Sequence, residues 1–395
     1  MIRTYLLVGI MSLVMVISCQ QQTSKWPVTL REEEGVMVVH NPDQPYYGEL
    51  AFELEENLSL GAEKDDNYLF HRVRGLAVDD ENNIYVVDMG NYRIQKFDQK
   101  GKYLRTIGRK GQGPGEFNLP TTMFIDSKHN LYIRDFRKIH LFNQQGEFTG
   151  SFSLDYDLSD FAVDEDGHIL ANAILQPRDP ALGAIVKIDP NGKVINKIAE
   201  YTFPGIKIIV GEAATFALSC NHAYTPSLQF CSLGQNIYVY GFSSDYLIHM
   251  IDKEGNPILR IRKKDSPIPI SNDEKNKIIQ TSLQAFERRK ISISRRTVEE
   301  ILHFEENRAY FDRLLADDCQ RLYVRRVQSV LDESPLCEFD VFNREGYYLY
   351  KIKLPFSPEV IRDRHLYDIF TSEETGEVKI KRYKIKNWDK IKTGI

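Results

Sequence analysis

The sequence predicts an all-β protein, a six-bladed β-propeller with a small helical insertion between blades four and five. Three observations support this fold class. The 395 residues include 21 tyrosines and 21 phenylalanines but only 2 tryptophans, a composition that favours β-strands. A hairpin motif recurs six times along the chain. The recurrences are spaced as the blades of a propeller are spaced.

Each copy of the hairpin motif has an apolar strand, a polar turn and a second apolar strand. The clearest copies are Leu76–Val86, Phe124–Ile133 and Phe161–Leu170. Asp at the end of the first strand, with Asn or Gly in the turn, is typical of a tight hairpin because these residues cap the turn or tolerate a positive φ. Weaker copies occupy residues 232–239, 317–324 and 360–367.

The spacing of the copies indicates one domain. The first apolar residue after each turn is Ile84, Leu131, Ile169, Ile237, Leu322 and Leu366, at intervals of 47, 38, 68, 85 and 44 residues. Three of these intervals lie near the roughly 40–50 residues of a four-stranded blade. The two long intervals correspond to a blade plus an insertion.

The first copy extends into a longer motif. Asp88–Asp98 is followed by Gly101–Gly108 and by the glycine-rich segment Gly111–Phe117. This motif resembles the NHL repeat, and the chain over nearly its whole length resembles the six-bladed β-propeller lipoproteins of the Bacteroidetes. The resemblance implies structural roles, in which Ile94 and Phe97 fill the space between blades and the glycine-rich segment crosses to the next blade.

The N-terminus is typical of an exported lipoprotein. An apolar run, Leu6–Val16, is too short to span a bilayer and matches the hydrophobic core of a secretory signal. It leads into Ser18-Cys19, which resembles a bacterial lipobox. We therefore expect a lipoprotein signal peptide over residues 1–18, lipid on Cys19 and a lipidated tether over residues 19–34. The other interpretation is a plain signal peptide in which this cysteine has no role.

The lipobox resemblance implies a location in the cell envelope. Two or more acyl chains anchor a protein stably, so the first expected partner is a membrane. Gln20 stands where many lipoproteins retained at an inner membrane have Asp, and an outer-membrane location is therefore favoured.

The remaining residues, 35–395, form the expected propeller. Gly35–His40 and Leu50–Leu54 precede the first repeat, and we expect this N-terminal segment to close the last blade. One insertion spans residues 201–227. A second insertion, at about residues 271–305, is expected to be helical.

Helix signals are concentrated in the second insertion. Ser271 and Glu274 have the spacing of a capping box, as do Thr297 and Glu300. An apolar stripe at three- to five-residue steps follows the first box: Ile278, Ile279, Leu283 and Phe286. Packing of this stripe on the propeller is favoured over its exposure to a partner.

Composition and charge exclude several classes of protein. With 51 basic and 56 acidic residues the net charge is −5, which does not suit a nucleic-acid-binding protein. A hydrophobic content of 42% excludes a disordered chain and a multi-span membrane protein. An exported location permits disulfides, and buried free thiols are the alternative for the four cysteines other than Cys19: Cys220, Cys231, Cys319 and Cys337.

The candidate ligand-binding residues lie where the inner strands are expected to begin, at the mouth of the central channel. They are Arg72, Arg74, Asp160, Gln229, Asp312 and Arg313. Such charged residues cost desolvation energy unless water, a ligand or one another meets them. Their mixed charges lack the order of His and carboxylate residues that a metal site needs, so we expect no metal, no cofactor and no catalytic residue.

The sequence therefore favours a non-enzymatic binding or scaffolding lipoprotein of the bacterial cell envelope. Its channel mouth would bind a protein, a peptide or a small polar ligand. The alternative is a hydrolase or lyase with an active site at the same mouth. Internal pairing of the charges across a wet channel competes with both functions.

Overall fold

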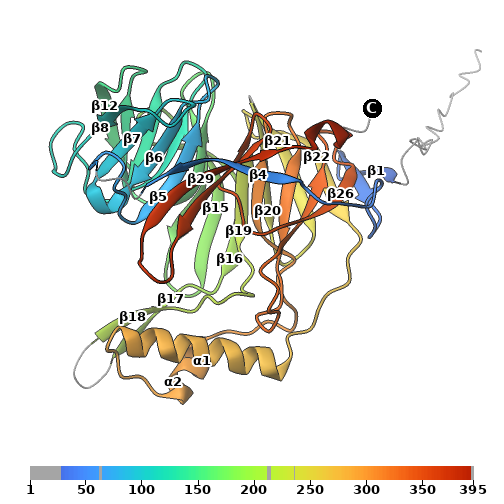
Figure 1. The fold of residues 1–395 in the computed structure, drawn as a ribbon. Helices are drawn as coiled ribbons and strands as arrows, with labels where there is room; N and C mark the ends of the chain where they lie inside the picture. The colour runs from blue at the N-terminus through green and yellow to red at the C-terminus, as the bar shows by residue number, and fades with distance from the viewer. Residues whose placement is uncertain (1–27, 62–64, 211–214, 235, 393–395) are drawn as a thin grey trace, which may run out of the picture.

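The computed structural model describes residues 28–61, 65–210, 215–234 and 236–392. These residues form a six-bladed β-propeller, as predicted, with the blades arranged in chain order around the ring (Figure 1). The inner strand of each blade contacts the inner strands of both neighbours, and the sixth contacts the first. The ring is therefore closed.

The first three blades are antiparallel four-stranded sheets that run from an inner to an outer strand. Blade one contains β5 (Val73–Val78), β6 (Ile84–Asp88), β7 (Arg93–Phe97) and β8 (Tyr103–Ile107), with the short 3-10 helix η1 (Met89–Asn91). Blade two contains β9 (Pro120–Ile125), β10 (Leu131–Asp135), β11 (Lys138–Phe142) and β12 (Phe148–Ser153). Blade three contains β13 (Asp157–Val163), β14 (Ile169–Gln176), β15 (Ala181–Ile188) and β16 (Val194–Phe203).

The last three blades each recruit a strand from the N-terminal segment. Blade four contains β19 (Leu228–Ser232), β20 (Ile237–Phe242), β21 (Leu247–Asp252) and β22 (Pro257–Lys263). Blade five contains β23 (Phe311–Ala316), β24 (Leu322–Arg326), β25 (Cys337–Phe342) and β26 (Tyr348–Leu354). Blade six contains β27 (Val360–Arg362), β28 (His365–Thr371) and β29 (Val378–Ile385), followed by η2 (Trp388–Lys390).

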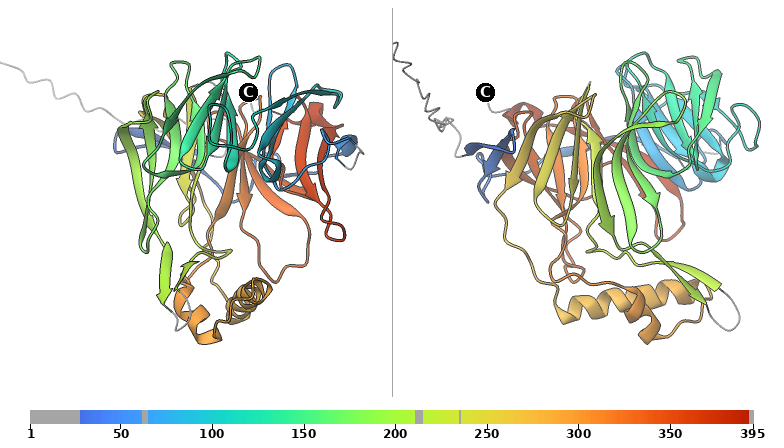
Figure 2. Two further views of the ribbon diagram at one scale, coloured as in Figure 1. Left: turned by 90° about the vertical axis from the view of Figure 1, so that its left-hand side faces the viewer. Right: turned by 180° about the vertical axis from the view of Figure 1, so that it is seen from behind.

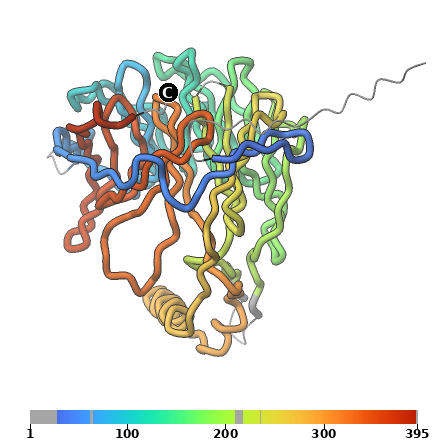
Figure 3. The backbone as a smooth tube through the Cα atoms, turned by 90° about the vertical axis from the view of Figure 1, so that its right-hand side faces the viewer, coloured from blue at the N-terminus to red at the C-terminus, as the bar shows by residue number. Residues whose placement is uncertain are grey.

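The N-terminal segment, residues 28–60, forms a belt outside blades four, five and six (Figures 1 and 3). β1 (Thr29–Glu33) and β2 (Val36–Asn41) form a hairpin, and β2 pairs in parallel with β22. β3 (Glu49–Leu50) pairs in parallel with β26, and β4 (Leu54–Leu60) pairs antiparallel with β29. The outer strand of blade six is therefore β4, whereas β2 extends blade four.

Hydrophobic packing lies mainly between the blades. Six clusters of buried side chains each join residues of two neighbouring blades, one cluster for each interface of the ring. Ile94 and Phe97 of the NHL-like motif are completely buried in two of these clusters, as the sequence predicts. Burial of so much apolar surface between blades makes each blade depend on both of its neighbours.

Two insertions form a cap on one end of the ring (Figures 1 and 2). The first is a hairpin of β17 (Ile206–Val210) and β18 (Thr215–Ser219), and the second contains α1 (Asn272–Arg288) and α2 (Arg295–Ile301). Each insertion connects the outer strand of one blade to the inner strand of the next, so the cap lies at the end where inner strands begin. Neither helix has the length and apolar character that a membrane-spanning helix requires.

The helix starts were predicted partly correctly. Ser271 and Glu274 form the expected capping box at the start of α1. The second box is wrong, because α2 begins earlier and Ser294 is its N-cap, accepting a hydrogen bond from the backbone N–H of Thr297. The apolar stripe of α1 packs against α2, Tyr224 and the loop that follows β24.

Glu274 ties the cap to blade five. Its carboxylate is 2% exposed and accepts hydrogen bonds from the hydroxyls of Tyr224 at 2.5 Å and Ser329 at 2.7 Å. Arg308 Nη2 lies 2.5 Å from the same carboxylate. Burial alone would raise the pKa of Glu274. The hydrogen bonds from these hydroxyls and from Ser271, the N-cap residue of α1, outweigh the effect of burial and lower the pKa to about 2. Glu274 is therefore ionised at neutral pH.

Candidate functional site

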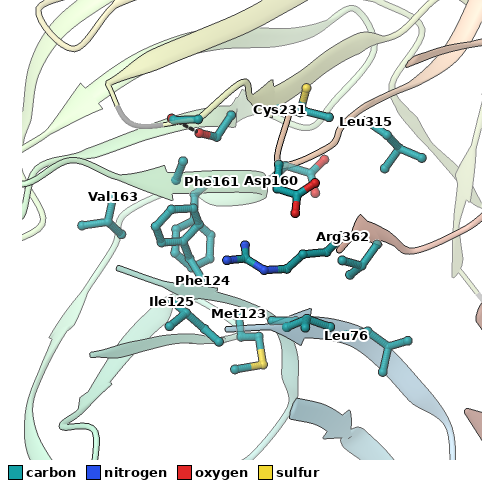
Figure 4. Close-up of a pocket in the computed structure, with 18 of the residues that line it drawn as sticks. Leu76, Met123, Phe124, Ile125, Asp160, Phe161, Val163, Cys231, Leu315 and Arg362 are labelled. Atoms are coloured by element: carbon teal, nitrogen blue, oxygen red, sulfur yellow. Dashed lines mark hydrogen bonds between the residues drawn. The ribbon is translucent and has the colours of Figure 1, made fainter. Parts of the chain in front are cut away.

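The central channel is a cavity of about 790 Å³ lined by the inner strands of all six blades. One end, the strand-start mouth, is bounded by Arg74, Gln229, Arg313 and Glu359. The other end, the strand-end mouth, lies at the hairpin turns that join each inner strand to the second strand of its blade. Side chains between the two mouths are largely apolar (Figure 4).

Four of the six candidate residues line this channel: Arg74, Asp160, Gln229 and Arg313. They come from blades one, three, four and five, so residues far apart in the sequence meet at one site. Gln229 is oriented by its own blade, because its Nε2 donates to the hydroxyl of Ser227 at 2.8 Å. Arg74 is exposed to the channel and makes no hydrogen bond or ion pair within the described part of the chain.

Two candidates lie outside the channel lining. Arg72 is exposed in the loop before β5, where its backbone adopts a left-handed conformation with φ of 54°. Asp312 lies at a β-bulge of β23 and accepts two hydrogen bonds from Arg325, at 2.6 and 2.8 Å. This pairing ties Asp312 to the second strand of its own blade, so neither Arg72 nor Asp312 lies in the channel lining, and a role of either in ligand binding stays a prediction.

A cluster of charges connects blades three, five and six near the strand-start mouth. Arg313 donates through both terminal nitrogens to Glu359, at 2.6 and 3.3 Å. Enclosure in the channel raises the pKa of Asp160, and the nearby Arg313 and Arg134 partly oppose this rise. Burial and the charge of Glu359 raise the pKa of Asp368, on β28, to about 6. The cluster therefore contains a carboxyl that titrates near neutral pH.

The strand-end mouth is dominated by structural carboxylates. Four aspartates directly follow the inner strands of blades one, two, three and five, and each accepts backbone N–H bonds from residues two and four positions later: Asp79, Asp126, Asp164 and Asp317. Such side-chain caps hold the hairpin turns. The acidic residues of the repeat are thus largely committed to the fold.

Arg362 is a channel residue that the sequence interpretation missed. It ends β27 at the repeat position where four other blades have Asp. Its side chain extends across the channel toward Phe124 and Phe161 (Figure 4). The signal was present in the sixth copy of the hairpin motif, where Arg replaces the turn-capping Asp.

Two potential nucleophiles of the channel, Cys231 and Ser232, are not activated. Burial raises the pKa of the Cys231 thiol, and the neighbouring Asp160 raises it further, so the thiol is protonated at neutral pH and is a weak nucleophile. The hydroxyl of Ser232 donates to the carbonyl of Gly234 at 2.8 Å. His129 lies at the strand-end mouth with its Nε2 3.0 Å from Asp80.

Two hairpin turns bring together side chains of metal-binding type. One turn contains Asp164, Asp166 and His168, and the other contains Asp317, Asp318 and Cys319. Basic side chains already neutralise both groups: Lys187 lies 3.7 Å from Asp164, Lys253 lies 2.8 Å from Asp166, and Arg321 lies 2.7 Å from Asp317. These contacts are those expected of structural turns.

The cysteines of the described chain are unpaired. Cys220, Cys231, Cys319 and Cys337 are all free thiols. Cys19, the signal peptide and the first part of the tether lie outside the described residues, so the lipidation site stays a prediction.

Comparison with known proteins supports the repeat and the fold. The chain is 27% identical over 134 residues to the protein brain tumor of Drosophila melanogaster, and 32% identical over 84 residues to human NHL repeat-containing protein 3. The first alignment covers 32% of this chain and 12% of the Drosophila protein. The second covers 20% of this chain and 24% of the human protein. These matches confirm the resemblance to NHL repeats.

Two solved structures from Bacteroides share the propeller fold. One, from Bacteroides fragilis and described as exported, is 13% identical with a TM-score of 0.51, covering 88% of this chain and 99% of its own. The other, a member of the DUF4221 family from Bacteroides vulgatus, is 12% identical with a TM-score of 0.53, covering 85% and 98%.

A family assignment follows from a longer match. Residues 63–317, well over half of the chain, match the family described as a domain of unknown function, DUF4934. The chain therefore belongs to the DUF4934 family.

Proposed function

We propose that this chain is a non-enzymatic binding lipoprotein of the bacterial cell envelope, which holds a polar ligand or a peptide segment in its channel. The observation that carries this proposal is the channel of about 790 Å³ in which polar side chains from different blades converge. Such a volume lies within the range of ligand sites, roughly 300–1,000 Å³.

The charges at the strand-start mouth favour binding over purely internal pairing. Arg313 has Glu359 as its partner, but Arg74 faces the same space with no ion pair or hydrogen bond among the described residues. A guanidinium held in a partly enclosed space is stabilised when an anion or a polar group enters. The unactivated Cys231 and Ser232 favour binding over the hydrolase or lyase alternative.

A location in the envelope is part of the proposal. The lipobox-like Ser18-Cys19 supports a lipid anchor. The related fold of the Bacteroides fragilis protein described as exported supports export. Replacement of Cys19 by Ala should release the protein from the membrane fraction of its host, measured by fractionation and immunoblotting. Full retention of the Cys19→Ala variant in the membrane fraction would contradict a lipid anchor at this residue.

The binding proposal is tested with a double variant of the channel. Arg74→Ala together with Asp160→Ala should keep the melting temperature of the protein and lose capture of small molecules or peptides from an envelope extract, read by mass spectrometry. The matched control replaces two exposed residues outside the channel, Arg105→Ala and Asp155→Ala, and should capture normally.

Two outcomes would overturn the binding proposal. Earlier melting of the channel variant with unchanged capture would show that Arg74 and Asp160 are internal structural charges. Release of a captured compound in chemically altered form, dependent on the same residues, would favour the hydrolase or lyase alternative.

A further inference from the structure

We propose that the channel binds an amphipathic anion, with its acidic group on Arg362 and its apolar body against Phe124 and Phe161. This inference rests on the proposed binding function and names the ligand class. It gives a role to Arg362 and to an apolar surface, neither of which was among the candidate residues identified from the sequence.

The turn of blade six explains why Arg362 is free to enter the channel. In blade one, four turn residues separate Asp79 from the second strand, β6. The Asp79 carboxylate accepts backbone hydrogen bonds from this turn and thereby caps it. In blade six, Arg362 pairs directly with His365, and only Asp363 and Arg364 form the turn. Both turn residues have positive φ, 46° and 63°, as a two-residue hairpin requires. The shorter turn needs no capping carboxylate at the last position of the inner strand.

The charge of Arg362 has no partner among the described residues. Within the described part of the chain no carboxylate lies within ion-pair distance of its guanidinium, whereas five other arginines of the ring each have one: Arg93 with Asp88, Arg313 with Glu359, Arg321 with Asp317, Arg325 with Asp312 and Arg326 with Asp265. The nearby acidic groups are already engaged. Asp317 accepts from Arg321 and Tyr323, and Asp318 accepts the backbone N–H of Asp363.

An apolar surface lies beside this unpaired charge. The rings of Phe124 and Phe161 have centroids 6.4 Å apart at an angle of 46°, and both line the channel. Further apolar side chains from blades one, two, three and five continue this surface: Leu76, Met123, Ile125, Val163 and Leu315. Figure 4 shows Arg362 extending toward the two rings.

Together these features define the ligand chemistry. A planar guanidinium binds carboxylate, sulfonate or phosphate oxygens with two parallel hydrogen bonds. Aromatic and aliphatic walls gain free energy by removing apolar ligand surface from water. A simple inorganic anion would leave these walls wet, and a neutral apolar molecule would leave Arg362 unpaired. The expected ligand therefore has both an acidic group and an apolar body.

The test uses two fluorescent probes that share an aromatic body. 1-Anilinonaphthalene-8-sulfonate carries a sulfonate, and N-phenyl-1-naphthylamine lacks it. We expect the purified full-length protein to bind one equivalent of the sulfonate probe, and Arg362→Gln to weaken this binding by at least about ten-fold. The control Arg364→Gln, two residues away on the exposed turn, should bind like the wild type.

Competition separates the two parts of the ligand. Octanoate should displace the sulfonate probe, whereas octanol and inorganic phosphate at the same concentration should not. Displacement by octyl phosphate as well as octanoate would indicate that Arg362 accepts either kind of acid. These measurements use the wild-type protein, so they remain decisive if Arg362→Gln does not fold.

The outcomes distinguish this inference from the proposed function. Equal sulfonate-probe affinity of wild type and Arg362→Gln, or equal displacement by octanol and octanoate, would overturn the ligand class while leaving capture through Arg74 and Asp160 intact. Failure of the wild type to bind the sulfonate probe would also overturn it. Loss of the proposed function would instead appear as unchanged envelope capture by the Arg74 and Asp160 double variant.

Discussion

Blade one and blade six are built on the same hairpin repeat but use equivalent positions differently. In blade one the inner strand ends at Val78, and the next residue, Asp79, accepts hydrogen bonds from backbone N–H groups and from the hydroxyl of Tyr85. In blade six it ends in Ile361-Arg362, and the Arg362 side chain enters the channel. One position therefore caps a turn in the first blade and faces a cavity in the last.

The second strands of the two blades differ in the same way. Blade one continues with Tyr85-Val86, and Val86 is completely buried. Blade six continues with Tyr367-Asp368, and the pKa of Asp368 is raised to about 6. Where the repeat is kept, its residues stabilise the fold, and where the repeat is lost, charged groups become available near the channel.

The blades also differ in how they are completed, which leads to the largest expected effect. Blade one contains its own four strands, but blade six takes β4 from the N-terminal belt. Deletion of residues 28–60 should abolish cooperative thermal unfolding, because blade six then lacks its outer strand and exposes a sheet edge. Deletion of residues 28–33 alone, which removes only the edge strand β1, should leave a cooperative transition. A transition of the larger deletion close to that of the full chain would show that the belt does not close the ring.

Asp79 gives the next largest effect. The Asp79→Ala variant should lose about 3–5 kcal/mol in the free energy of unfolding, because Tyr85 and Lys96 would remain buried without this carboxylate. The neighbouring Asp80 is 65% exposed at its side chain, and Asp80→Ala should cost less than about 1 kcal/mol. Urea unfolding of both variants measures the difference. Equal losses would contradict a special structural role of the repeat carboxylate.

The cap offers a third contrast, since it lies outside the repeat and is held by Glu274. The pKa of Glu274 is lowered to about 2 in the folded protein from an ordinary value of 4.5. Its stabilising effect is therefore present above pH 4.5 and is lost as the pH falls toward 2. Glu274→Gln should destabilise the cap by about 1–3 kcal/mol at neutral pH, seen as faster hydrogen exchange in α1 with unchanged exchange in blade one. Equal acceleration in both regions would show that the cap and ring unfold together.

Asp368 gives a smaller effect of opposite sign. The pKa of Asp368 in the folded protein, about 6, exceeds its ordinary value of 3.8, so folding favours the protonated carboxyl. The contribution of this group to stability is fully present below pH 3.8 and is lost as the pH rises through 6. Asp368→Asn should therefore raise stability by about 1 kcal/mol at pH 7.5, a value reduced for solvent screening of this half-buried group, and by almost nothing at pH 3.5. Thermal unfolding at the two pH values checks this. The same gain at both would contradict the raised pKa.

The fold was predictable because its signals are local. An Asp-capped turn between two apolar strands marks each of the clear blades, and Ser271 with Glu274 marks the start of α1 within four residues. The parallel pairing of β2 with β22 and of β3 with β26 was not predictable, because each pairing joins segments separated by more than 200 residues. Strand pairing at such separation depends on the assembled ring rather than on neighbouring residues.

The candidate site was predictable only in part. Arg74, Asp160, Gln229 and Arg313 were found because inner strands are recognisable from the repeat. Asp312 was misplaced because its carboxylate pairs with Arg325 on the second strand of its blade. This pairing has no clear sequence signal. Arg362 stands in the sequence where other copies have the turn Asp. The shortened hairpin of the sixth copy shifts its alignment with the other copies, so this replacement was not recognised.

Stability without ligand should barely change in the Arg362→Gln variant. The side chain has no partner in the described structure, so its loss should alter the free energy of unfolding by less than about 0.5 kcal/mol. Urea unfolding followed by circular dichroism checks this value. A loss comparable to that of Asp79→Ala would mean that Arg362 is a structural residue.

The most direct test of the division between fold and site is ligand-induced stabilisation of the same variant. A ligand that binds only the folded state at 100 times its Kd should stabilise it by about 2.7 kcal/mol. With the sulfonate probe at that excess over the wild-type Kd, we predict this gain in wild type and in Arg364→Gln, and at least about half of it lost in Arg362→Gln, as a ten-fold or greater rise in Kd requires. An equal gain in Arg362→Gln would contradict the account, because the departure from the repeat in blade six would then have no part in binding.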